Sequence, residues 1–346
     1  MHRSIKRYPR QPFGIPGSTE QVVESRPFVE LRRFVPTGGP RGPRVLLVAP
    51  LSGHHSTLLR DTITSLLEDH DVYVTDWRDA RDVPLSEGTF SLDDYVAEVR
   101  GFLQRLDAAS THVVAVCQPT VPVLAAVSLD AAAGLPTPRS LTLLGGPVDA
   151  RVSPTQVNKL ASDRSMAWFE HAMTYRVPPG YRGAGRKVYP GFLQLTAFMM
   201  MNPEKHFKAH MDYWTAQLTG TSHEAIASHE AFYDEYNAVL DMDARYYLDT
   251  VRVVFQEYAL ARGTWRVDGV LVEPAAIRTT PLLTIEGELD DISGLGQTEA
   301  AHALTPNTVR HQHYIARGAG HYGLFSGRRW RTEIYPELRA FIEASK

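Results

Sequence analysis

The 346-residue sequence is poor in cysteine, in net charge and in long apolar runs, and each shortage excludes a class of protein. A single cysteine, Cys117, permits neither an internal disulfide nor a thiolate metal cluster. No apolar run reaches the roughly 18 residues that span a bilayer, and the basic segment 1–10 is not followed by the apolar core of a signal peptide. A net charge of −3 offers no electrostatic basis for binding nucleic acid. These shortages predict an intracellular protein that contacts neither membrane nor nucleic acid.

The remaining composition, 43% hydrophobic and 22% charged, is sufficient for a full core. Short β-branched runs alternate with amphipathic stretches, and this alternation predicts a mostly parallel sheet with helices on both faces, an α/β fold. We expect strands near 44–49, 72–75, 113–116, 140–144, 281–285 and 309–315, and helices near 56–68, 91–106, 120–129 and 332–344.

The strand rhythm divides the chain into three parts. Residues 1–26, rich in Arg, Pro and Gly, are expected to be a poorly ordered arm or a segment wrapped over the surface, followed by an edge strand at Phe28 to Phe34. Residues 27–149 and 277–346 form the predicted α/β core. Residues 150–276 are helical in pattern and crowded with aromatic and methionine side chains, which predicts a helical lid.

Cys117 lies between a predicted buried strand, Val113 to Val116, and a helix of small apolar residues, Thr120 to Leu129. Such a strand–turn–helix segment is a candidate nucleophile elbow, in which the helix N-terminus stabilises a thiolate. Ala115 and Pro119 stand where glycines usually allow close packing. The alternative is that Cys117 is a small buried hydrophobe.

Two further ionisable positions follow the last two predicted strands. Asp290 or Asp291 comes after the first of them and His321 after the second, so that the order Cys, Asp, His is the order found in α/β-hydrolases. In this reading Cys117 attacks, His321 transfers protons and the aspartate orients the imidazole. Asp290 is preferred because it lies three residues after Gly287, in a Gly-x-x-Asp turn.

A tetrahedral intermediate needs at least two donors for its oxyanion. The N–H of Gln118 is one candidate, and Leu51 or Ser52 is the expected source of the second, although the latter segment is equally consistent with an ordinary N-cap turn. Residues that could contact substrate, or could instead be core packing, are His54, Trp168, Phe198, Trp214 and Tyr322. No metal is expected, because no cysteine or clustered carboxylate completes a ligand set with His311 and His313.

The sequence also resembles the intracellular poly(3-hydroxybutyrate) depolymerases, from about Arg26 to the C-terminus. The resemblance rests on Ala49-Pro-Leu-Ser-Gly-His54, Thr57-Leu-Leu-Arg60, Val116-Cys-Gln-Pro119, Pro190-Gly-Phe-Leu-Gln194, Phe232-Tyr-Asp-Glu-Tyr236, Glu286-Gly-Glu-Leu-Asp-Asp-Ile-Ser-Gly294 and Gly320-His-Tyr-Gly323. It implies an α/β-hydrolase fold whose triad of Cys117, Asp290 and His321 cleaves stored polyester at granules in the bacterial cytoplasm. The expected partners are the polymer or its oligomers, the granule surface and a second copy of the chain in a homodimer.

No cofactor is expected, although the acyl acceptor could be water or the thiol of coenzyme A. Two alternatives remain open. A polyhydroxyalkanoate synthase-like acyltransferase would use the same three residue types, but its elbow is normally Gly-x-Cys-x-Gly, which Ala115 and Pro119 do not match. A catalytically silent granule-binding protein would keep the fold without turnover.

Overall fold

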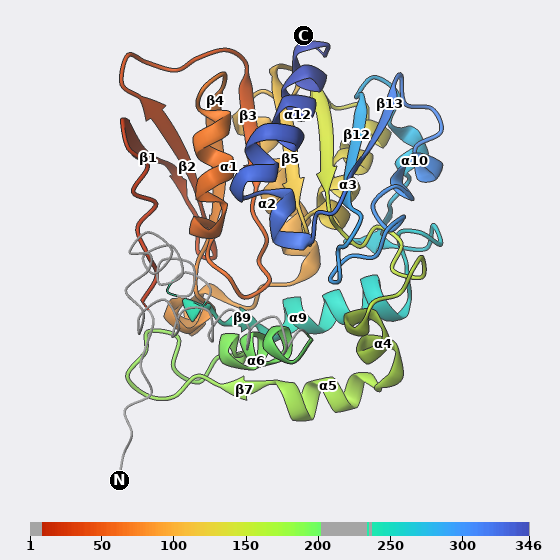
Figure 1. Cartoon of the computed structure of the whole chain (residues 1–346). Helices are drawn as coiled ribbons and strands as arrows, with labels where there is room; N and C mark the ends of the chain where they lie inside the picture. Colours follow the sequence, from red (N-terminus) through yellow and green to blue (C-terminus); the bar gives the residue numbers. More distant parts are fainter. Residues whose placement is uncertain (1–8, 202–233, 235–236, 346) are drawn as a thin grey trace, which may run out of the picture.

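A computed structural model describes residues 9–201, 234 and 237–345, and its centre is an eight-stranded sheet (Figure 1). The strand order is β1-β2-β4-β3-β5-β6-β12-β13. β1 pairs antiparallel with β2 and β2 antiparallel with β4, whereas the remaining neighbours are parallel. The strands are β1 (Ser18–Ser25), β2 (Val29–Pro36), β3 (Arg44–Val48), β4 (Asp71–Trp77), β5 (Thr111–Val116), β6 (Ser140–Leu144), β12 (Leu282–Gly287) and β13 (His311–Ala316).

Helices cover both faces of this sheet, as the sequence predicts. β4, β5, β6 and β12 are buried along their whole length, as expected for parallel strands shielded on two sides. In Figure 1 the C-terminal helix α12 lies in front of the strands and α3 lies behind them. The core helices are α1 (Arg60–Leu66), α2 (Leu92–Arg105), α3 (Thr120–Ala132), α10 (Ala301–Leu304), α11 (Gly327–Arg329) and α12 (Tyr335–Glu343).

The start of the chain differs from the predicted loose arm. Residues 18–25 form β1, the outermost strand of the sheet, so β2 is an interior strand and not the edge. Phe13 is buried against Phe34 with ring centroids 4.9 Å apart, and Arg60 donates hydrogen bonds to the carbonyls of Pro12 and Phe13. The prediction failed because β1 is mostly solvent-exposed and carries no apolar face of its own, so its pairing depends on β2.

Between β6 and β12, the described residues add no strand to the main sheet. Instead, helices α4, α5, α6 and α9 lie across the end of the sheet at which the parallel strands terminate (Figure 1). The elements of this insertion are α4 (Gln156–Asp163), α5 (Met166–Met173), β7 (Tyr175–Arg176), β8 (Lys187–Tyr189), α6 (Gly191–Met201), β9 (Met242–Asp243), α9 (Ala244–Thr250), a π-helical turn (Val251–Gln256), β10 (Arg266–Val267) and β11 (Val270–Leu271). None of the described helices combines the length and hydropathy of a membrane span.

Arg186 fastens the insertion to the core. Its guanidinium pairs with Asp243 at 2.8 Å, and the two side chains are 2% and 3% exposed. The same guanidinium donates to the carbonyl oxygens of Val83, Pro84 and Gly88, which belong to the core segment between β4 and α2. Each of the three guanidinium nitrogens therefore donates a hydrogen bond to an oxygen, as burial of a charge requires.

Replacing Arg186 by methionine should destabilise the protein by about 3–5 kcal/mol, because Asp243 and three carbonyl groups would lose their donor inside the fold. Lys187→Met is the matched control, since the neighbouring Lys187–Glu170 pair is exposed at 43% and 50% and should contribute little to stability. Urea unfolding of both variants measures the difference. Equal losses would show that the Arg186 contacts do not hold the insertion.

Candidate active site

Cys117 occupies a strained turn between β5 and α3. Its φ of 68° lies in the left-handed region, which costs a non-glycine residue about 1–2 kcal/mol. The turn is held on both sides, because the Cys117 N–H donates to Leu144 O at 2.7 Å and the Cys117 carbonyl accepts from the Thr120 N–H at 3.1 Å. The thiol is partly exposed at the start of α3, in the predicted elbow geometry.

The glycines missing from the elbow itself are compensated by the neighbouring segment. A Cβ atom on Gly146 would lie 2.2 Å from the Cys117 carbonyl oxygen and 1.9 Å from Thr120 Oγ1. Gly145 has a φ of 57°, and a Cβ there would lie 2.6 Å from Leu324. The close approach that an elbow requires is therefore supplied by the end of β6, so Ala115 and Pro119 do not prevent it.

His321 and Asp290 form the second part of the site. His321 Nδ1 lies 2.7 Å from Asp290 Oδ2, while Asp290 Oδ1 accepts the N–H groups of Ile292 and Ser293, each at 2.9 Å. Both side chains are almost completely buried. Asp291 is exposed and Asp290 faces the imidazole, so the geometry agrees with the preference for Asp290.

The surroundings of His321 favour its charged form. Burial alone would lower the pKa of the imidazole, but the hydrogen-bonded Asp290 carboxylate and the nearby Cys117 side chain raise it well above its ordinary value. The Cys117 side chain is thus within interaction range of the ring, and the three predicted triad residues come together although they lie far apart in the sequence.

Two glutamines hold the segment that follows β3 against the elbow. Gln118 Oε1 accepts the N–H of Leu51 at 3.2 Å, and Gln118 Nε2 contacts the Tyr246 hydroxyl on α9. Gln194 of α6 donates to the carbonyl of Ser52. The Leu51 N–H therefore already donates to Gln118, whereas neither the Ser52 N–H nor the Gln118 N–H donates to any described residue. This pattern favours Ser52 over Leu51 as the second oxyanion donor.

A cavity of about 730 Å³ opens beside Cys117, Gln118 and Ser52. Most of its wall comes from the insertion and is apolar or aromatic, and the residues that supply it include Leu160, Phe169, Met173, Tyr189, Leu193, Met242, Tyr247, Val251 and Phe255. Its volume lies in the range of small-molecule sites, and its apolar wall with few polar groups is typical of them. The cavity therefore suits an extended, largely apolar acyl group.

The residues predicted to contact substrate are mostly placed elsewhere. Trp168 is not part of the cavity wall; it packs edge-to-face on Phe169, at 5.0 Å between ring centroids, and Phe169 lines the cavity instead. His54 and Tyr322 also lie outside the wall, and Tyr322 packs between the rings of His54 and His321. The side chain of Phe198 and the whole of Trp214 lie outside the described residues.

Comparison with known proteins places the chain in a family. Residues 145–346, more than half of the chain, match the family described as the PHB de-polymerase C-terminus. The chain belongs to this PHB depolymerase family. No curated protein sequence matches the chain. Family membership together with the fold supports an ester hydrolase, and it confirms the resemblance that the sequence motifs indicated.

Solved structures establish the α/β-hydrolase fold. A bromoperoxidase from Bacillus anthracis aligns with a TM-score of 0.52 at 12% identity, over 94% of this chain and 99% of that one. DcsB in complex with its substrate analogue aligns with a TM-score of 0.53 at 14% identity, over 94% and 99%. A membrane phospholipase A described as a bacterial virulence factor has a TM-score of 0.50 at 15% identity, over 96% and 88%. At such identities the similarity shows the fold alone.

Gln118→Met should lower kcat on a p-nitrophenyl ester by about 10- to 100-fold with little change in KM, because the Ser52 segment would lose its tether to the elbow. The control is Gln156→Met, which alters a glutamine in the cavity wall that, among the described residues, forms no hydrogen bond with Leu51 or Ser52. Steady-state kinetics on both variants distinguish the two roles. A similar fall in kcat for both would contradict a positioning role for Gln118.

Proposed function

We propose that the protein is an intracellular polyhydroxyalkanoate depolymerase that cleaves ester bonds of poly(3-hydroxybutyrate) through an acylated cysteine. The observation that carries the proposal is the Cys117 thiol at a left-handed elbow, beside an apolar cavity and within interaction range of a buried His321–Asp290 pair. Membership of the PHB depolymerase family supports the choice of substrate.

In the first half-reaction the Cys117 thiolate attacks the ester carbonyl carbon, and the developing oxyanion accepts hydrogen bonds from the N–H groups of Ser52 and Gln118. Collapse of the tetrahedral intermediate breaks the bond to the alkoxy oxygen. The His321 imidazolium gives its proton to that oxygen, which leaves as the hydroxyl end of the shortened chain. Asp290 keeps the His321 Nδ1–H in place while the ring changes charge.

In the second half-reaction neutral His321 accepts a proton from the incoming nucleophile, which attacks the acyl thioester and restores the Cys117 thiolate and the imidazolium. Water as nucleophile releases a 3-hydroxybutyrate unit or oligomer, and coenzyme A would release its thioester. No cofactor takes part in either step. We place the reaction at polymer granules in the cytoplasm and expect a homodimer.

The insertion would act as a lid over a polyester chain. Methyl-bearing polyester segments are apolar, with ester carbonyls at intervals, so they suit the aromatic and methionine wall beside Cys117. Enclosure would exclude bulk water and strengthen the hydrogen bonds to the oxyanion. Two residues of this insertion contact the groups that carry the oxyanion donors: Gln194 donates to the Ser52 carbonyl, and the Tyr246 hydroxyl contacts the Gln118 side chain. Closure over substrate and alignment of the donors would therefore be coupled.

The proposal is tested by incubating the protein with a 3-hydroxybutyrate oligomer and analysing the intact mass. Wild type should carry a 3-hydroxyacyl adduct on Cys117, and Cys117→Ala should carry none and should have no turnover. Product analysis with and without coenzyme A then identifies the acyl acceptor. An adduct that persists in Cys117→Ala would contradict the mechanism. Folded wild type that binds polymer without turnover would indicate a silent granule-binding protein.

Phe169→Ala should lower kcat/KM on a hydroxybutyrate trimer by about 10-fold or more, while activity on p-nitrophenyl acetate changes less than about 3-fold, because the cavity wall serves the longer acyl chain. Trp168→Ala removes the adjacent ring, which lies outside the wall, and should leave the ratio of the two activities unchanged. Phe169→Leu, which keeps most of the buried volume, guards against a folding defect. Equal ratios in Phe169→Ala and Trp168→Ala would place the polymer elsewhere.

A further inference from the structure

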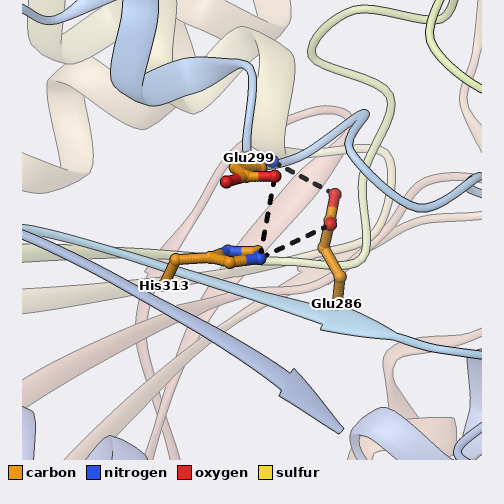
Figure 2. A group of neighbouring side chains, drawn as sticks. All are labelled: Glu286, Glu299 and His313. Carbon is orange, nitrogen blue, oxygen red and sulfur yellow. Dashed lines mark hydrogen bonds and ion pairs between the residues drawn. The ribbon is translucent and has the colours of Figure 1, made fainter. Parts of the chain in front are cut away.

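Three potential metal ligands converge at the edge of the sheet, outside the proposed active site. Glu286 extends from β12, His313 from the edge strand β13, and Glu299 from the segment that follows the Asp290 loop (Figure 2). One ligand atom from each residue lies within 4.8 Å of the other two. His313 Nε2 is 3.9 Å from a carboxylate oxygen of Glu286 and 3.9 Å from one of Glu299.

The first two ligands are held firmly in place. Glu286 is 3% exposed, and its carboxylate accepts the N–H groups of Gly296, Thr298 and Glu299. His313 Nδ1 lies 2.8 Å from the hydroxyl of Thr284, a fully buried residue. A metal-binding histidine characteristically donates its second ring N–H to such an oxygen, which fixes the tautomer with a lone pair on Nε2.

The orientation of His313 Nε2 points to a cation. The atom is buried and has no hydrogen-bond partner among the described residues, and it faces two carboxylates that lie beyond hydrogen-bond range. Two carboxylates that face one point repel one another, and a cation held between them and His313 Nε2 would remove that repulsion. One imidazole nitrogen and two carboxylate oxygens form a ligand set that suits Zn²⁺.

We propose that Glu286, Glu299 and His313 form a structural site for a divalent transition-metal cation of the Zn²⁺ type. Tetrahedral Zn²⁺ holds neighbouring ligand atoms about 3.4 Å apart, and the three ligand atoms here lie within 4.8 Å of one another, so binding requires the side chains to close in, chiefly by a movement of Glu299. Glu299 can make that movement because its side chain is 54% exposed. Water would occupy the fourth position.

A cation there would brace the loop that carries Asp290. Glu286 precedes this loop and Glu299 follows it, so one bound ion would fasten both ends of residues 287–298 to β13. From the sequence, no clustered carboxylate was expected to complete a ligand set with His311 and His313. Glu286 and Glu299 are separated in the chain from each other and from these histidines, so no local pattern marks them as a cluster. The structure corrects that premise, although His311 is not part of the set.

The test is zinc binding by the full chain, measured by titration calorimetry with ZnCl₂. Cys117→Ala serves as the background, because the active-site thiol and His321 could themselves bind Zn²⁺. One Zn²⁺ should bind per chain. Glu299→Gln should raise the dissociation constant for Zn²⁺ at least 10-fold, and His313→Gln should abolish binding. Glu87→Gln, which alters an exposed glutamate outside the cluster, should bind as tightly as the background.

A thermal measurement on the protein with Cys117 intact provides the second readout. Saturating Zn²⁺ should raise the unfolding midpoint by at least about 2 °C, and Glu299→Gln should lose this rise. The test does not depend on His313→Gln folding, because Glu299 is half exposed and its replacement leaves the strands unchanged. The proposal would be overturned if Cys117→Ala bound no Zn²⁺, or if Glu299→Gln and Glu87→Gln bound it equally tightly.

Discussion

The left-handed turn at Cys117 is the constraint on which the arrangement of the site depends. The turn directs the thiol out of the sheet at the start of α3, but it brings the Cys117 carbonyl so close to the end of β6 that only glycine fits at position 146. The preceding residue, Gly145, lies beside Asp290 and His321. One backbone conformation therefore determines the spacing of three separate loops, and the cost of the strained turn is met by hydrogen bonds on both sides of it.

The charges around His321 determine its protonation state. The His321 ring is buried, and burial alone would lower its pKa. The Asp290 carboxylate and the neighbouring Cys117 side chain reverse the effect and raise the pKa. Because the folded pKa lies above the unfolded value, the pair stabilises the protein fully below about pH 6.5, and this contribution is lost as the pH rises through the raised folded pKa. Stability and proton transfer at this site thus depend on the same three side chains.

The sequence predicted the features that local pattern encodes. The apolar run before Cys117 and the Gly-x-x-Asp spacing before Asp290 each reflect a nearby physical requirement, and the α/β fold predicted from such patterns is confirmed. Contacts that depend on distant segments could not be derived in this way. Trp168 and Phe169 are adjacent aromatics on one short helix, and only the packing of α5 decides which one faces the cavity. β1 was missed for a similar reason, since its polar sequence becomes a strand only through pairing with β2.

The attachment of the insertion through Arg186 has a consequence for sequence variation. Three of the four groups around this guanidinium are main-chain oxygens, and any amino acid at positions 83, 84 and 88 supplies the same atom. The fastening depends on the path of that loop and hardly at all on its side chains. A substitution that preserves the path of the loop therefore leaves the fastening intact, whereas the Arg186–Asp243 pair can change only if both partners change together. That path restricts position 88, where glycine adopts a φ of 76°, and position 83, where valine is buried.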